Sequence, residues 1–210
     1  MRRVYEAVGV DAGDLGPDPV VAFGRWFADV AAAGVVEPNA MVLATVGFDG
    51  EPAARTVLLK GYDGHGLRFF TNLGSAKAAE LAANPRAALV FPWHPVSRQV
   101  RVTGSVERLS RDAVEAYFAT RPRESQLGAW ASPQSQVVGS RAELDAALAD
   151  AAARFPGEVP PPPGWGGFQV VPDVWEFWAG RSGRLHDRLR YRRPDGSGLH
   201  AAWTIERLAP

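Results

Sequence analysis

The 210-residue chain contains no cysteine, and only two of its 23 basic residues, Lys60 and Lys77, are lysines. The absence of cysteine excludes disulfides, thiolate metal sites and cysteine nucleophiles. The four histidines lie far apart without the spacing of metal ligands, so no metal is expected. No apolar run approaches the roughly 20 residues that a membrane span needs, and the first residues lack a signal-peptide pattern. We therefore expect a cytoplasmic protein with no membrane contact.

Charge is balanced over the whole chain but unevenly distributed along it. The 23 basic residues match 23 acidic ones, whereas residues 1–50 carry seven acids against three bases and residues 181–193 contain six arginines. This distribution favours one focused anion site over a general affinity for nucleic acid. Lysine is a compact point charge and arginine a planar fork, so the two lysines mark positions where a point charge is needed.

The order of predicted elements indicates one domain, mostly β, with peripheral helices. Residues 17–36 have helical apolar spacing, with Asp18 as the N-cap and Pro19 in the first turn. Three further helices are predicted around residues 75–85, 110–122 and 140–155. Between and after them lie six to eight short strands, mostly joined as hairpins, which favours an antiparallel barrel. Residues 1–16 are expected to form a flexible arm, and the proline-rich stretch 159–167 a stiff connector before the last strands (residues 159–210).

The stretch RSGRLHDRLRYRR (181–193) carries the strongest local concentration of positive charge. In a strand, Arg184, His186, Arg188, Arg190 and Arg192 would share one face. Aligned cations repel each other unless an anion lies against them, and they would favour the neutral form of the histidine. We interpret this face as a wall for an anionic or electron-rich ligand. The alternative is a solvated edge strand whose charges discourage aggregation.

Two segments that contain the lysines are candidates for anion binding. In ARTVLLKGYDG (54–64), strand alternation would place Arg55 and Lys60 on opposite faces of the sheet. In FFTNLGSAKAAEL (69–81), Lys77 falls in the first turn of a helix, which is unfavourable unless an anion also binds there. Together with Thr71, Ser75 and free N–H groups it predicts a phosphate seat. The alternatives are an ordinary amphipathic strand and a capped helix with a stray lysine.

A second phosphate seat is predicted in YFATRPRESQLGAWASPQSQ (117–136). Tyr117 and Arg121 are four residues apart and share a helix face, and Ser125 follows in a stretch without strong periodicity. A surface loop is the alternative. Near the arginine-rich stretch, Trp178 is a candidate to flank a flat ring, although tryptophan in a strand more often lies in the core.

These segments together resemble one family. The stretches RTVLLKGYD, FFTNLGSAKAAEL, NPRAALVFPW, RQVRVTG, YFATRPRESQLGAWASPQS, GWGGF, EFWAG, RLHDR and the terminal RLAP are similar to those of the pyridoxamine (pyridoxine) 5′-phosphate oxidase family, over about residues 17–210. The resemblance implies an FMN-binding split barrel and a homodimer with FMN at the interface. It also implies oxidation of pyridoxamine or pyridoxine 5′-phosphate to pyridoxal 5′-phosphate by O2, with release of H2O2.

The resemblance also assigns roles to residues that match the family motifs. The implied FMN contacts are Arg55, Thr56, Val57, Leu58, Leu59, Lys60, Phe70, Thr71, Lys77, Gln99, Gln134, Ser135, Trp178 and Arg188. The implied seat of the substrate phosphate is formed by Lys60, Tyr117, Arg121 and Ser125. Arg184 and His186 are implied to be the catalytic pair, with Arg184 stacked on the substrate ring and His186 hydrogen-bonded to the ring substituents. Family members often carry a basic residue where this chain has Ala76, which predicts a weaker hold on the FMN phosphate.

Two other functions are kept open. The first is an FMN oxidase of a secondary-metabolite intermediate, as in phenazine-biosynthesis relatives, although a substrate without phosphate would not need Tyr117, Arg121 and Ser125. The second is a binding module for a polyanion, which the near-zero net charge disfavours. The preference between amine and alcohol substrates stays open. So does gating of the site by Arg2 and Tyr5 of the N-terminal arm.

Overall fold

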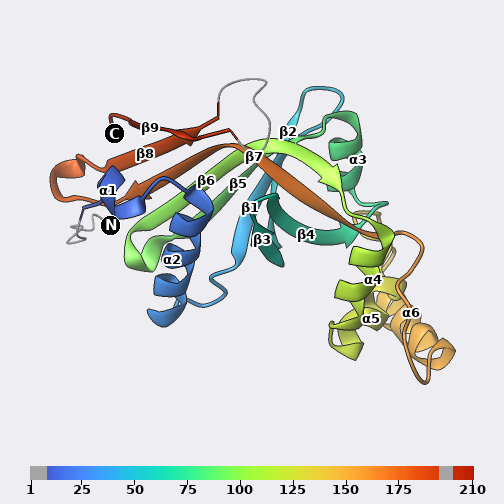
Figure 1. Ribbon diagram of the computed structural model, residues 1–210. Helices are drawn as coiled ribbons and strands as arrows, with labels where there is room; N and C mark the ends of the chain where they lie inside the picture. Colours follow the sequence, from blue (N-terminus) through green and yellow to red (C-terminus); the bar gives the residue numbers. More distant parts are fainter. Residues whose placement is uncertain (1–8, 194–200) are drawn as a thin grey trace.

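Alternating apolar and polar residues build one curled antiparallel sheet in the part of the chain that the computed structural model describes, residues 9–193 and 201–210 (Figure 1). The strands are β1 (Ala40–Val46), β2 (Pro52–Leu58), β3 (Gly61–Asp63), β4 (Gly66–Asn72), β5 (Arg86–Trp93), β6 (Arg98–Arg108), β7 (Trp165–Ala179), β8 (Asp187–Arg192) and β9 (Thr204–Arg207). Their order is β2-β1-β5-β6-β7-β4-β3, and β8 and β9 continue from β7. The predicted antiparallel split barrel is confirmed, with nine strands over these residues instead of six to eight.

Strand β7 is the branch point of this sheet, because one of its edges pairs with β6 and the other with both β4 and β8. It is 15 residues long, and it pairs with β4 through its first residues and with β8 through its last. Glycines permit the close approach of the strands: a Cβ atom on Gly166 would lie 2.5 Å from the Leu73 side chain. A Cβ atom on Gly104 in β6 would lie 2.0 Å from the Val171 carbonyl oxygen, where the β6–β7 register shifts. The bulge bends the pair and so helps the sheet to curl.

Helix α2 (Pro19–Ala32) covers the main core. Asp18 caps it by accepting a hydrogen bond of 2.8 Å from the Val20 N–H, as predicted. Its Phe23 is fully buried, with ring centroids 5.0 Å from Phe91 and 5.5 Å from Trp175. The helix therefore occupies a shorter range than the predicted 17–36 but has the predicted cap and apolar face.

Four other helices gather at the side of the molecule away from α2 (Figure 1). They are α3 (Ala76–Ala83), α4 (Arg111–Ala119), α5 (Arg123–Ala131) and α6 (Arg141–Arg154). Helices α4 to α6 pack around a second buried cluster that includes Phe118, Leu127 and Trp165. The sequence does not predict α5, because Leu127 is its one buried residue and no apolar period marks the helix.

The N-terminal arm expected over residues 1–16 contacts the main core in its described part. Helix α1 (Ala12–Leu15) begins after Asp11, and Val10 and Leu15 are buried, with exposed fractions of 7% and 2%. Residues 1–8, which include Arg2 and Tyr5, and the turn at 194–200 lie outside the described residues. None of the helices in the described part of the chain is long and apolar enough to cross a membrane.

Candidate active site

Most of the predicted site residues meet in one cavity of about 550 Å³, whose lining comes from β2, β4, α3, α4, α5 and the start of β7. Twelve of the predicted residues line it: Arg55, Thr56, Val57, Leu58, Lys60, Phe70, Thr71, Lys77, Tyr117, Arg121, Ser125 and Gln134. Four of these side chains are basic, and no described residue that lines the cavity is acidic. Such a lining creates a positive potential in a recessed site, which favours an anionic ligand.

Lys77 occupies one corner of the cavity, in the first turn of α3. Its Nζ donates hydrogen bonds to Gln134 Oε1 at 2.8 Å and to Thr71 Oγ1 at 3.3 Å. Burial and the nearby Arg55 lower the pKa of Lys77, although Glu80 opposes the shift. Ser75 lies buried at the N-cap with its hydroxyl 3.5 Å from Thr71 Oγ1. A phosphate here would meet lysine, hydroxyl and backbone donors together.

Arg55 and Lys60 both line the cavity, so the expectation that they serve opposite faces is wrong. Strand β2 ends at Leu58, and strand alternation does not extend to Lys60. Arg55 is held by a 2.7 Å ion pair with Glu80. Leu59 does not line the cavity: its side chain is in the core, its N–H donates to the Asn39 carbonyl at 2.8 Å, and its carbonyl accepts from Asn39 Nδ2 at 3.2 Å.

Arg121 forms the other corner. Its guanidinium lies 4.2 Å from the Trp165 ring, and Nη1 is buried without a hydrogen-bond partner among the described residues. Burial lowers the pKa of Arg121, although Tyr117 opposes the shift. Tyr117 stacks on Phe70 with centroids 3.9 Å apart and an interplanar angle of 15°. A buried guanidinium N–H without an acceptor is costly, and it is suited to bind an anionic oxygen.

Five of the remaining predicted residues, Gln99, Trp178, Arg184, His186 and Arg188, form a second group on and beside β6, β7 and β8, whereas Ser135 lies in the turn after α5. Gln99 pairs with Trp178 across β6 and β7, and Trp178 pairs with Arg188 across β7 and β8, so the three side chains form a row on one face. The His186 ring centroid lies 4.7 Å from that of Trp178. Arg188 binds both carboxylate oxygens of Glu176, at 3.0 and 3.2 Å, and these hydrogen bonds raise the pKa of Arg188.

The predicted strand over 181–193 is only partly correct. Alternation holds in β8, where Asp187, Leu189 and Tyr191 are buried, but the strand begins at Asp187. Arg184 instead ends the short 3-10 turn η2 (Ser182–Arg184) with a φ of 62°, so it does not continue the arginine face. His186 Nδ1 accepts a hydrogen bond of 3.1 Å from the Arg181 N–H. In the neutral imidazole, the ring proton is therefore on Nε2.

The two groups lie at opposite ends of the sheet in one chain. Trp165 lines the cavity at the start of β7, whereas Trp178 lies 13 residues later on the same strand. At the rise of an extended strand the path between them is roughly 40 Å, and Figure 1 shows the β7–β8 connection far from α3 and α4. The predicted residues Gln99, Ser135, Trp178 and Arg188 do not line the cavity, and neither do Arg184 and His186, the pair that the family resemblance implies to be catalytic.

Some cavity residues were absent from the predicted set. Thr120, Pro122 and Trp165 line the cavity as well. Of these, Trp165 has a sequence signal, because it lies in the motif GWGGF that carries part of the family resemblance. Glu80 and Glu176, which hold Arg55 and Arg188, have no such signal, because an ion pair between distant segments depends on the folded register.

Comparisons with known proteins identify the family of the chain. A sequence model described as pyridoxamine 5′-phosphate oxidase matches residues 27–154, and one described as the pyridoxine 5′-phosphate oxidase C-terminal dimerisation region matches residues 165–210. The pyridoxine/pyridoxamine 5′-phosphate oxidases of a Nocardioides species and of Streptomyces avermitilis are 57% and 56% identical to this chain. Both alignments cover the whole chain and 96% and 95% of the relative, respectively.

Solved structures share the fold. PhzG from Burkholderia lata, in complex with tetrahydrophenazine-1-carboxylic acid, has a TM-score of 0.91 and 29% identity, with 99% of this chain and all of that chain covered. A pyridoxamine 5′-phosphate oxidase-related, FMN-binding protein from Nostoc punctiforme has a TM-score of 0.73 and 21% identity, over 93% of this chain and all of that chain. The matches to family models and to full-length relatives decide the assignment: the chain belongs to the pyridoxamine 5′-phosphate oxidase family of FMN-dependent oxidoreductases.

Proposed function

We propose that this protein oxidises pyridoxamine 5′-phosphate or pyridoxine 5′-phosphate to pyridoxal 5′-phosphate, with O2 as the electron acceptor and H2O2 as a product. Oxidation of the amine consumes water and releases ammonia, whereas the alcohol gives the aldehyde directly. The observation that carries the proposal is Arg121, which lines the same cavity as Lys77 and whose buried Nη1 has no hydrogen-bond acceptor among the described residues. Two separate donor corners in one basic cavity suit a cofactor and a substrate that each carry a phosphate.

The lining of the cavity fits FMN. Lys77, Thr71 and the N-terminal turn of α3 would hold its phosphate, and Arg55 adds charge nearby. When bound, FMN would supply the two-electron redox chemistry that links oxidation of the substrate to reduction of O2. The protein supplies binding and orientation, and the Arg55–Glu80 ion pair keeps the arginine in place for that task.

The Arg121 corner would hold the phosphate of the substrate. Tyr117 and Ser125 line the same part of the cavity, and Lys60 adds a cation whose side chain forms no ion pair among the described residues. Binding energy from a phosphate remote from the reacting carbon can hold that carbon in position. Stacking of Tyr117 on Phe70 fixes the phenol for this contact.

A second copy of the chain would complete the site. Arg184 and His186 lie too far from the cavity in their own subunit, and the family's dimerisation region spans β7 to β9, which flank these two residues. We infer that the partner subunit's Arg184 covers the substrate ring and that the partner subunit's His186 donates its Nε2 proton to a ring substituent. Gln99, Trp178 and Arg188 of the same face would contact FMN.

The structural likeness to PhzG supports an alternative, an FMN oxidase of a phenazine-type intermediate without phosphate. Arg121 could bind a carboxylate there, but a substrate of that kind gives no role to the two separate donor corners. Turnover of pyridoxine against that of pyridoxine 5′-phosphate separates the two functions. Strong preference for the phosphate ester supports our proposal, and indifference to the phosphate favours the alternative.

The direct test is a flavin spectrum and a peroxide assay on the purified protein. We expect the visible absorption of bound FMN and H2O2 release with pyridoxamine 5′-phosphate, pyridoxine 5′-phosphate or both. A colourless protein that does not bind added FMN, or a flavoprotein that oxidises neither compound, would contradict the proposal.

A further inference from the structure

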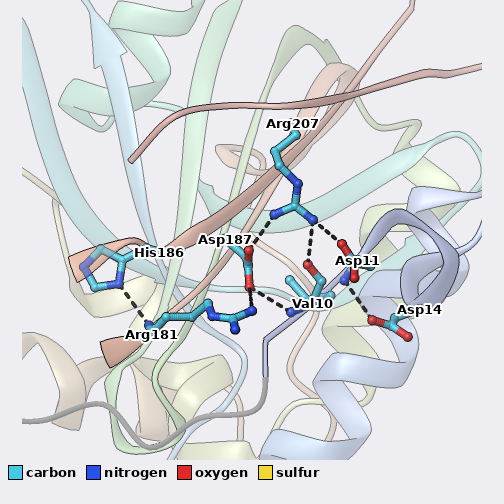
Figure 2. Close-up of polar contacts among 7 residues, drawn as sticks. All are labelled: Val10, Asp11, Asp14, Arg181, His186, Asp187 and Arg207. Carbon is cyan, nitrogen blue, oxygen red and sulfur yellow. Dashed lines mark hydrogen bonds and ion pairs between the residues drawn. The ribbon is translucent and has the colours of Figure 1, made fainter. Parts of the chain in front are cut away.

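Asp187 lies at a junction of three segments that are distant in the sequence (Figure 2). It is the first residue of β8 and is 7% exposed. Its Oδ2 accepts hydrogen bonds from the Val10 N–H and from Arg181 Nη1, both at 3.0 Å, and its Oδ1 accepts one from Arg207 Nη1 at 2.5 Å. One buried carboxylate thus joins the N-terminal segment, the β7–β8 connection and β9.

Arg181 carries this junction to the neighbouring imidazole. Its guanidinium binds Asp187, while its backbone N–H donates to His186 Nδ1 at 3.1 Å, as Figure 2 shows. Asp187 therefore holds the side chain of Arg181, and the backbone N–H of Arg181 holds His186. The packing leaves little freedom, because a Cβ atom on Gly9 would lie 2.0 Å from Arg181 Nη1 and 2.7 Å from Asp187 Oδ2.

The charges at the junction favour an ionised carboxylate. Burial opposes ionisation, but the hydrogen bonds from Arg181, Val10 and Arg207 outweigh it and lower the pKa of Asp187. Arg207 is in turn held by Asp11 and by the Val10 carbonyl at 3.3 Å. The junction is consequently a network centred on one buried carboxylate. The side chains of Arg181 and Arg207 are 50% and 45% exposed, so solvent screening reduces what their charges contribute.

We propose that Asp187 is a positioning residue for His186, acting through Arg181, and that Val10 and Arg207 hold its carboxylate in place. The Arg181 N–H occupies Nδ1, so it keeps the proton of the neutral ring on Nε2, the nitrogen that would face the substrate. The catalytic role of His186 in this inference rests on the proposed function. The position of the proton on its imidazole ring does not.

The test compares Asp187→Ala, Arg181→Met and the double variant with Asp145→Ala as a matched control. Asp145 is an exposed aspartate in an i,i+4 pair with Arg141 on α6, remote from the junction. In the FMN-loaded protein we expect kcat with pyridoxamine 5′-phosphate to fall roughly tenfold to a hundredfold in each single variant, as misplacement of a catalytic group does. We expect KM and FMN content to stay near wild type. Because Asp187 acts through Arg181, the double variant should be no slower than the slower single variant.

The second readout does not depend on turnover. Nitrogen NMR of histidine-labelled protein, with the His186 signals assigned from His186→Gln, reports the protonation of the two ring nitrogens. We expect wild type and Asp145→Ala to show an unprotonated, hydrogen-bonded Nδ1, and Asp187→Ala and Arg181→Met to lose that signature. If Asp187→Ala does not fold, Arg181→Met decides, because it leaves the contacts of Asp187 with Val10 and Arg207 intact.

The failures of the two proposals can be told apart. If wild type is active and His186→Gln is slow, but Asp187→Ala and Arg181→Met keep both kcat and the Nδ1 signal, the positioning role is overturned and the proposed function stands. Additive losses in the double variant also overturn it. If wild type releases no peroxide with either substrate, the proposed function fails, and the NMR signals still decide whether Asp187 sets the state of the ring.

Discussion

Replacement of Arg121 by methionine is expected to weaken substrate binding without weakening the fold. The guanidinium packs against Trp165, at 4.2 Å, and Phe118, at 5.2 Å, and its buried Nη1 has no protein acceptor among the described residues. Methionine keeps most of the apolar contact and removes the charge. The variant therefore shows whether Arg121 serves ligand binding or the stability of the fold.

The expected magnitudes follow from these contacts. A hydrogen bond to a charged group contributes about 1.5–3 kcal/mol, so loss of the contact with the phosphate should raise KM roughly tenfold to a hundredfold, with a smaller change in kcat. In the substrate-free protein, the unsatisfied buried Nη1 of Arg121 destabilises the fold by about 1–3 kcal/mol. The cation–π contacts of the guanidinium offset about 0.5–2 kcal/mol of that cost. The free energy of unfolding should then stay within about 2 kcal/mol of wild type.

The assay combines steady-state peroxide release with urea unfolding, and Arg123→Met is the matched control. Arg123 is the neighbouring arginine, exposed and bonded to the carbonyls of Phe155 and Gly157 instead of lining the cavity. The control should leave KM unchanged. An unchanged KM in Arg121→Met, or a loss of stability well beyond 2 kcal/mol with no change in KM, would refute the assignment of this corner to the substrate.

Four further results are expected. Arg184→Ala should lower kcat far more than FMN content, measured by flavin absorbance after gel filtration, and equal loss of both would contradict its catalytic role. Lys77→Met should raise the Kd for FMN roughly tenfold to a hundredfold in fluorescence titration, because a charge-assisted contact is lost. Ala76→Arg, at an exposed position in the first turn of α3, should tighten FMN binding a few-fold at low salt and less at high salt; no change at either would place the phosphate elsewhere. The pKa of Asp187 is below its ordinary 3.8, so its stabilisation is complete above about pH 4 and is lost as the pH falls through the folded pKa. The difference in urea stability between wild type and Asp187→Ala should accordingly shrink below that pH, and a constant difference would rule out the ionised carboxylate as its source.

Features that depend on local chemistry could be predicted from the sequence. The Asp18 cap, the alternation in β1 and β5, and the place of Lys77 in the first turn of α3 each follow from a few adjacent residues. Both predicted phosphate seats also lie in one cavity. Local patterns of this kind are strong where capping or periodicity decides the backbone.

Features that depend on tertiary contacts could not be predicted. Gly183 and Arg184 adopt positive φ values of 67° and 62°, which end the predicted strand before Asp187. Helix α5 lacks an apolar period because only Leu127 of it is buried. The separation of Arg184 and His186 from the cavity follows from the length of β7, which no short motif reports.

We propose that each active site combines the cavity of one subunit with the partner subunit's Arg184 and His186. Subunit complementation tests it most directly: Arg121→Ala and Arg184→Ala chains are unfolded together, refolded and assayed below the wild-type KM, where each variant alone is nearly inactive. A shared site gives mixed dimers with one intact site and one doubly defective site, so random mixing should restore about a quarter of wild-type activity. If every site lies within a single chain, no mixed dimer contains an intact site, and activity will stay at the level of the separate variants.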